Sequence, residues 1–461
     1  MDAFLTALKG VIDSLGATVM LPVLIFIIAV IMGAKVGKAF RAGVTIGIAF
    51  IGINLVIGLM WGSLSEVGQA MVTNLNIQRD VVDVGWPSAA AIAFGTRVGL
   101  WVIPIAILVN VVLLALRLTR TLNVDIWNFW HFAFIGSLVS IASGSLVLGL
   151  VAAALAAALA LLLADWTAKA VQSFYNLPGI SIPHLTTAPG VPFAIITNWI
   201  IDRIPGLRDI EIDPEGIQKR LGVMGEPVIL GLFIGLILGL LAFFNLGSFQ
   251  AVLVKVLQTG MNLAAVMLLL PRMVQILMEG LIPVSEAARE FMQKRAGGRE
   301  IYIGLDSAIL IGHPAALSTS LVLVPVAILL SIILPGNRVI LFADLAIIPF
   351  VVALFAPLMR GNIFRMIIAG TLELLVGFYI ATGMAPLFTS AATEAGFAMP
   401  ENALQITSIG DGFLWPAWAF SALGRLGVIG IAIVAVVLVA AWFFYMKNQK
   451  AWEVAAGAPQ E

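Results

Sequence analysis

Long apolar stretches separated by short polar segments follow one another along most of the 461-residue chain. A helix needs about 20 mainly apolar residues to cross the hydrocarbon core of a bilayer. By that length the pattern predicts about eleven membrane-spanning helices. They are expected at residues 17–34, 42–62, 96–116, 132–149, 150–164, 226–245, 251–282, 308–334, 339–357, 364–384 and 427–446.

The run 132–164 is too long for one span, and small and polar residues around Ser143 and Gly144 interrupt it, so we expect two helices there. The first apolar run is followed, not preceded, by a basic cluster, which is not typical of a cleaved signal peptide. We therefore expect 17–34 to be a retained span.

Basic residues gather after every second expected span. If every span crosses, they all lie on one side of the membrane, and the positive-inside rule places the N-terminus outside and the C-terminus in the cytoplasm. The basic residues on this side are Lys35, Lys38, Arg41, Arg117, Arg120, Arg203, Arg208, Lys219, Arg220, Arg289, Lys294, Arg295, Arg299, Arg360, Arg365, Lys447 and Lys450.

The chain also resembles itself at an offset of about 220 residues. The sequence IPIAIL at 103–108 is matched by VPVAIL at 324–329, and other short matches follow in the same order. Five spans per copy make the second copy inverted relative to the first, as in alternating-access carriers. We expect one repeat at 1–224, a second at 225–424, and an extra span with a cytoplasmic tail at 425–461.

Two segments follow the fifth span of each copy but are broken by proline and glycine, at 178–205 and 406–423. Irregular backbone at membrane depth is tolerated where it is buried in protein or lines a cavity. We expect two re-entrant hairpins that enter from opposite faces; surface loops or interfacial helices are the alternative. The predicted fold is an all-α polytopic membrane protein.

Composition supports a membrane protein, with 61% hydrophobic residues, 11% charged residues and a mean hydropathy of +1.08. The formal net charge is zero, which gives no indication of nucleic-acid binding. The chain has no cysteine, which excludes disulfides, thiolate metal sites and cysteine nucleophiles. No P-loop and no zinc-protease or serine-hydrolase motif occurs, so we expect neither a cofactor nor a metal.

Polar residues within apolar segments are costly and mark candidate sites. His184 and Thr186 lie in the middle of the first hairpin, where they can donate and accept hydrogen bonds with a polyol. The alternative is that His184 only satisfies a backbone carbonyl at the hairpin turn. Asp306 and His313 are seven residues apart and would share one face of a helix. The alternative is that they cap that span.

Asp83 holds the position in the first repeat that Asp306 holds in the second. Trp86 beside it can stack on a sugar alcohol or lie in the interfacial belt. Asn128 and His131 are about one helical turn apart and can face a cavity. Asp125 is expected to be a helix N-cap.

If transport is driven by an ion gradient, Asp306, Glu373 or Asp344 offers the proton or sodium site, and Arg272 is a further candidate ion or proton site. Glu373 and Arg272 lie well inside expected spans, where each can equally be half of a buried pair.

Several motifs resemble the galactitol-type IIC component of the bacterial phosphotransferase system. They are residues 81–87, 123–128, 182–184, 304–306, 312–313, 335–337 and 361–362. The resemblance runs from about residue 18 to residue 365 and implies a homodimeric carrier with eleven spans and two hairpins. Leu185-Thr186-Thr187 departs from the family pattern Gly-Thr-Ser, which leaves the sugar open.

The resemblance implies that a polyol is phosphorylated at the cytoplasmic face of the inner membrane by a IIB protein, which IIA recharges. It places His184, Asp306 and His313 near the sugar, with Asp306 or His184 as general base. Basic loops such as 289–299 are expected to dock IIB. The alternatives are an ion-coupled secondary transporter of a small polar solute and a non-transporting sensor.

Overall fold

The computed structural model describes residues 22–74, 79–295, 300–341, 343–400 and 403–460, together with Val19. Among these residues, six helices are long and apolar enough to cross a membrane, or seven if one bent pair forms a single span. Helices satisfy their backbone hydrogen bonds internally, as lipid requires. The chain is a polytopic helical protein, and the expected eleven crossings are only partly matched by long helices.

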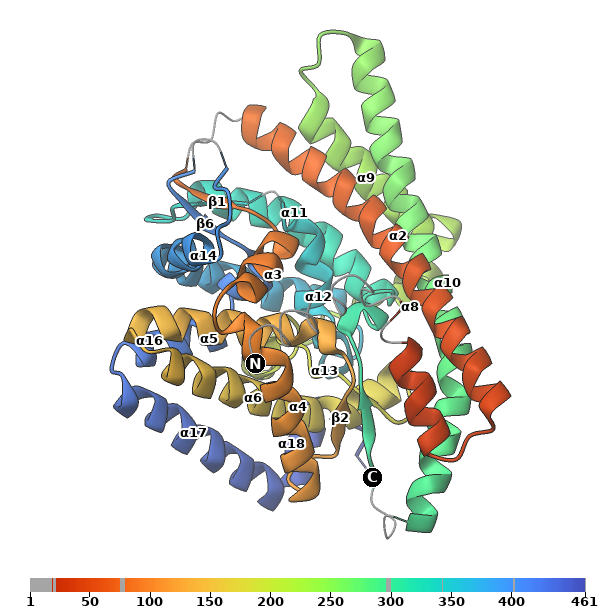
Figure 1. Ribbon diagram of the computed structural model, residues 1–461. Coiled ribbons are helices and arrows are strands. Elements are labelled where there is room, and N and C mark those ends of the chain that lie inside the picture. The colour runs from red at the N-terminus through yellow and green to blue at the C-terminus, as the bar shows by residue number, and fades with distance from the viewer. Residues whose placement is uncertain are drawn as a thin grey trace.

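Three helices form an arm along one side of the molecule (Figure 1). They are α2 (Val36–Asn74), α9 (Pro227–Phe243) and α10 (Phe249–Arg295), and a helix at Pro22–Ile31 precedes α2. Glycines allow α9 to approach α10 closely, because a Cβ added at Gly235 would lie 2.7 Å from the Gly260 Cα. Small residues at such contacts are typical of helix packing in membranes.

The remaining helices lie beside the arm, and most of them pack together as a core (Figure 1). The α-helices are α3 (Trp86–Gly95), α4 (Gly99–Ala115), α5 (Trp130–Ser143), α6 (Leu146–Phe174), α7 (Gly190–Ile201), α8 (Pro214–Leu221), α11 (Pro314–Ile333), α12 (Ile348–Val352), α13 (Phe355–Leu358), α14 (Ile363–Glu394), α15 (Ile409–Gly412), α16 (Trp415–Gly424), α17 (Val428–Lys447) and α18 (Gln449–Ala455). Short 3₁₀ helices are η1 (Ile126–Phe129), η2 (Gly222–Gly225), η3 (Ser307–Ile309) and η4 (Leu345–Ile347).

The expected division of 132–164 is confirmed. Gly144 has a φ of +68°, which a glycine adopts without a steric penalty, and it separates α5 from α6. The expected span at 339–357 is wrong, because that segment is a short strand followed by η4, α12 and α13. Pro357 has no N–H to donate to the Ala353 carbonyl, and the helical segment breaks at that point, between α12 and α13. The helix expected at 96–116 is joined to α3 at a bend of 91°.

The expectation of a purely helical protein is also incomplete, because six strands of two or three residues occur among the described residues. They form two parallel sheets, ordered β5-β1-β6 and β2-β4-β3. The strands are β1 (Val81–Asp83), β2 (Thr121–Asn123), β3 (Ile180–Ser181), β4 (Tyr302–Gly304), β5 (Val339–Ile340) and β6 (Gln405–Thr407).

The two sheets have the same plan. The central strands β1 and β4 occupy matching places in the two halves of the sequence, as do β2 and β5, and β3 and β6. Each sheet takes its central strand from one half of the chain and both flanking strands from the other. The halves are therefore interlocked, and each sheet forms only when both are present.

The two proline- and glycine-rich segments are built alike. Residues 178–205 contain β3, a turn and α7, and residues 406–423 contain most of β6, then α15 and most of α16. Their turns meet, since the Thr186 Oγ1 donates to the Gly410 carbonyl at 2.9 Å and the Trp415 Nε1 donates to the Pro189 carbonyl at 2.8 Å. Thr186 is 1% exposed, so the first turn is not a surface loop.

Candidate functional site

A cavity of about 410 Å³ lies between α2 of the arm and the ends of the strands in the core. Its volume is within the range of small-molecule sites, about 300–1,000 Å³. The arm contributes Phe50, Asn54, Ile57, Gly58 and Trp61. The core contributes Trp86, Asp125, Asn128, Trp130, His184, Thr186, Asp306, Ala308, Ala343, Asp344, Ala346, Ile347 and Phe350.

The β2-β4-β3 sheet places three of the polar side chains in this cavity. Asp125 follows β2, Asp306 follows β4 and His184 follows β3 by a few residues each. Because the strands are parallel, their carboxyl ends meet at one edge of the sheet. Residues that are far apart in the sequence are thereby brought to one wall.

His184 and Asp306 face each other across this wall. The His184 Nδ1 accepts a hydrogen bond from the Thr186 backbone N–H at 3.2 Å. The ring proton of a neutral His184 is therefore on Nε2, which lies 3.7 Å from the Asp306 Oδ1. The His184 side chain is 7% exposed and that of Asp306 is 22% exposed, so the carboxylate is the more accessible group.

The strand ends of the second sheet, β5-β1-β6, also border the cavity, and Asp344 joins them there. One carboxylate oxygen of Asp344 accepts from the Trp86 backbone N–H at 2.7 Å. The other accepts from the Ser408 hydroxyl at 2.5 Å and from the Ile409 N–H at 2.8 Å. The Asp344 backbone N–H in turn donates to the Asp83 carboxylate at 2.7 Å. Asp344 and Asp83 thus fix strand ends, and Asp83 does not line the cavity.

Asn128 and Asp125 act together on the cavity wall. Asp125 occupies the N-cap position of η1, which leads directly into α5, as expected, but its side chain makes no capping hydrogen bond there. Its carboxylate instead accepts a hydrogen bond from the Asn128 side-chain amide. This contact orients both polar groups within the cavity.

His131 lies behind the cavity and not in its lining. Its Nδ1 is 2.8 Å from the Asp411 Oδ2, and its ring centre is 4.7 Å from that of His184. His131 is 1% exposed, and its Nε2 has no hydrogen-bond partner within the part of the chain that the structure describes. His131 therefore supports His184 and links it to the second hairpin.

His313 is not brought to the cavity. Asp306 precedes η3 and His313 precedes α11, so the two do not lie on one helix as expected. The His313 Nδ1 accepts from the Ala315 N–H at 3.2 Å, and its ring packs against those of Phe174 and Tyr175. This is the capping role that the sequence left as the alternative.

Glu373 and Arg272 also lie outside the cavity lining. The Glu373 carboxylate is close to Gly190 at the start of α7, and Arg272 is exposed on α10. Sequence reasoning missed the cavity wall formed by α2. Its signal was Asn54, a polar residue inside an otherwise apolar span, and Trp61, whose ring centre is 6.0 Å from that of Trp86.

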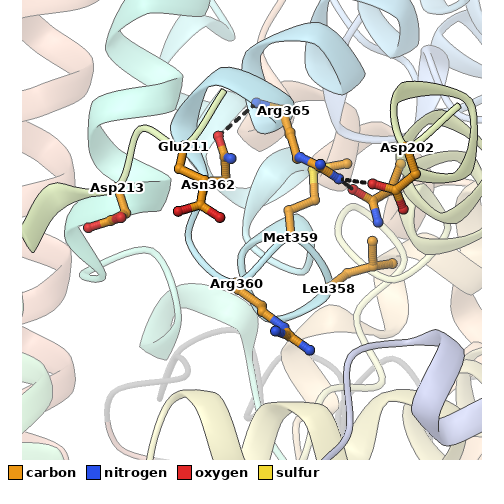
Figure 2. Close-up of a pocket in the computed structure, with 9 residues that line it drawn as sticks. Asp202, Glu211, Asp213, Leu358, Met359, Arg360, Asn362 and Arg365 are labelled. Atoms are coloured by element: carbon orange, nitrogen blue, oxygen red, sulfur yellow. Dashed lines mark hydrogen bonds and ion pairs between the residues drawn. The ribbon is translucent and has the colours of Figure 1, made fainter. Parts of the chain in front are cut away.

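A second cavity, of about 470 Å³, lies where the segment after α7 meets the start of α14 (Figure 2). Arg365 points toward Asp202, to which it donates a hydrogen bond at 2.6 Å, while Arg360 points away from both (Figure 2). A further bond at 2.6 Å joins Arg365 to the Asn198 side chain. Arg365 therefore fastens α7 to α14. Within the described ranges, no group of three or more His, Cys, Asp or Glu side chains is arranged to hold a metal ion.

Comparison with known proteins identifies the family. Residues 11–402 match the family described as the sugar-specific permease component of the phosphotransferase system. Galactitol-specific EIIC components of Escherichia coli K12 and O157:H7 are each 43% identical over 393 residues, which cover 85% of this chain and 85% of theirs. A further K12 relative, whose name specifies no sugar, is 40% identical over 413 residues, covering 89% of this chain and 93% of its own. The chain belongs to the family of sugar-specific permease components of the phosphotransferase system.

Proposed function

We propose that this protein carries a sugar alcohol, galactitol or a close relative of it, into the cell for phosphorylation by a partner IIB protein. The observation that carries the proposal is the convergence of Asp125, Asp306 and His184 on one cavity wall. The cavity lining combines polar donors and acceptors with the Trp61 and Trp86 rings, which suits a polyol because it has hydroxyl groups and C–H faces. The two galactitol-specific relatives agree with this substrate class.

Family membership makes the chain a multi-pass protein of the inner membrane. We propose that the N-terminus lies outside and the C-terminus in the cytoplasm, which agrees with the distribution of basic residues if the broken segment 339–357 also crosses the membrane. The repeats at 1–224 and 225–424 are proposed to be inverted, with residues 425–461 as an addition. The matching plans of the two sheets support an internal repeat.

The chemical step is a transfer of a phosphoryl group from a thiol to an alcohol. The polyol hydroxyl oxygen attacks phosphorus, the S–P bond of the IIB phosphocysteine breaks, and the thiolate leaves. Asp306 takes the hydroxyl proton. His184 Nε2 already carries a proton, which leaves it suited to donate a hydrogen bond to the polyol, while the more exposed Asp306 carboxylate is an acceptor. The base is therefore proposed to be Asp306 rather than His184.

IIB and IIA are the proposed protein partners, because this chain has no cysteine to carry the phosphoryl group. The docking loop expected at 289–299 lies partly outside the described residues, which resume at Glu300. A homodimer is proposed to form through the arm, whose helix α9 exposes an apolar face with Phe233, Ile237 and Leu240. The arm then stays fixed while the core moves against it.

The alternative function, an ion-coupled transporter, differs from the proposed function in its energy source. Vesicles that contain the purified protein, phosphoenolpyruvate, the general phosphotransferase proteins, IIA and IIB should accumulate galactitol phosphate. Uptake of unmodified galactitol that follows a proton or sodium gradient, with no phosphorylated product, would overturn the proposal. Asp344 would then be the first candidate for the ion site, although its carboxylate already accepts hydrogen bonds from three donors.

A further inference from the structure

The two sheets begin in the same way, each beside an arginine. Arg338 directly precedes β5, and its carbonyl accepts a hydrogen bond from the Val81 N–H of β1 at 3.2 Å. Arg120 directly precedes β2, and its carbonyl accepts from the Tyr302 N–H of β4 at 2.7 Å. The two arginines therefore occupy matching positions at the starts of the two sheets.

Their side chains have different kinds of partner. Arg338 pairs with Asp80, which directly precedes β1, through contacts of 3.0 and 3.1 Å from its Nε. The arginine of that sheet is therefore paired with a residue that adjoins a strand of the same sheet. The Arg120 Nη2 instead donates at 2.7 Å to the Oε1 of Glu453 on α18, a segment that belongs to neither sheet. The arginine of the other sheet is therefore paired with a residue of the C-terminal segment.

The Arg120 guanidinium is surrounded by a carboxylate, a hydroxyl group and an aromatic ring. Its guanidinium lies 4.9 Å from the centre of the Tyr302 ring, and its Nη2 also donates to the Tyr445 hydroxyl at 2.9 Å. The same oxygen of Glu453 accepts a bond from the Gln449 amide at 2.7 Å. The Arg120 and Glu453 side chains are 18% and 12% exposed, so the pair is sheltered but lies at the surface.

The segment that supplies Glu453 folds back over the end of α6. The Trp166 Nε1 donates to the Trp452 carbonyl at 2.5 Å, and the two ring centres are 4.9 Å apart. A groove of about 740 Å³ remains between this segment and α6. It is lined by Lys169, Gln172, Ser173, Asn176, Pro178, Glu300, Gln449, Lys450, Glu453, Val454, Ala458 and Pro459.

We propose that residues 449–460 are a latch whose Glu453 carboxylate occupies a site that a phosphoryl-bearing protein partner takes over. This rests on the proposed function, which puts this end of the molecule in the cytoplasm. Arginine binds phosphoryl groups through the same planar fork that binds a carboxylate, and a phosphoryl group carries more charge. Arg120 also leads directly into β2, which ends beside Asp125, so engagement of Arg120 acts on the strand that shapes the sugar cavity.

The test compares two carboxylate variants of the full-length protein in nanodiscs. Glu453→Gln keeps the shape of the latch but removes its charge, and a phosphorylated galactitol-type IIB protein should bind it about three- to tenfold more tightly than wild type. Asp209→Asn is the matched control, because Asp209 pairs with Arg208 at 3.3 Å and does not line the groove. It should leave the affinity unchanged. Arg120→Gln should weaken binding by about tenfold or more.

Movement of the latch is tested in the same samples. The chain has no cysteine, so a single Val454→Cys change gives one labelling site in the groove. Phosphorylated IIB should raise its rate of maleimide labelling. Equal affinity of wild type and Glu453→Gln, or no change in labelling, would overturn the latch alone. If wild type with IIB forms no polyol phosphate at all, the proposed function fails and the latch with it.

Discussion

His184 Nε2 lies 3.7 Å from Asp306 Oδ1, and the two residues follow the neighbouring parallel strands β3 and β4. The strands come from different halves of the chain, yet their pairing sets this distance. A base and a hydrogen-bond donor are thereby held side by side at the edge of one cavity. We propose a division of roles, in which Asp306 accepts a proton and His184 donates a hydrogen bond to the sugar.

Asp306→Asn should separate binding from chemistry. The amide keeps the size of the carboxylate but is a far weaker base, so polyol phosphate formation should fall about 10²–10⁴-fold. Galactitol affinity should change much less. Isothermal titration with galactitol, paired with a IIB-dependent phosphorylation assay, measures both. An equal loss of affinity and turnover would assign Asp306 to sugar binding and not to proton transfer.

His184→Ala and His313→Ala make a matched pair of histidine changes. His184 lines the cavity, so its loss should abolish measurable galactitol binding while the protein still inserts into the membrane. His313 packs against Phe174 away from the cavity, so its loss should lower thermal stability and leave affinity intact. Wild-type affinity in His184→Ala, or lost affinity in a folded His313→Ala protein, would reverse these assignments.

Trp415→Phe tests the contact between the two hairpin turns. The change removes the bond from Nε1 to the Pro189 carbonyl, which costs about 1–3 kcal/mol when a buried partner is left unsatisfied. Trp418→Phe is the control, because Trp418 is on the same helix and is 51% exposed. The melting temperature of the first variant should fall, and that of the second should stay close to wild type. The reverse order would show that the hairpins do not support each other through this bond.

The Asp80–Arg338 pair predicts a pH-dependent contribution to stability outside the membrane-spanning helices. The hydrogen bond from Arg338 holds the pKa of Asp80 below its usual value of 3.8. The stabilisation is therefore present above pH 3.8 and is lost as the pH falls through the lowered pKa. Both side chains are about a third exposed or more, so the contribution is below about 1 kcal/mol.

Arg338→Gln should accordingly lower the melting temperature at pH 7, and the difference from wild type should shrink as the pH approaches 3. Thermal melts in detergent at several pH values measure this. A difference that grows on acidification would contradict the pairing.

Several polar residues of the site were predictable from the sequence because they lie within or beside apolar stretches, whereas Asn54 was missed. Asp306, His184 and Asn128 all line the cavity as expected. The strands that position them were not predictable, since two or three residues are too few to show a period of two. Their pairing is also non-local, because each sheet combines both halves of the chain. His313 was misplaced because its spacing from Asp306 assumed a helix that begins only at Pro314.

The most direct test of the proposed site is a structure of the protein with galactitol bound. The ligand should lie between α2 and the strand ends, with one hydroxyl within hydrogen-bond distance of the Asp306 carboxylate and another near His184 Nε2. Density for galactitol in the cavity of Figure 2, beside Arg365 and Asp202, with the strand-end cavity empty, would contradict the account.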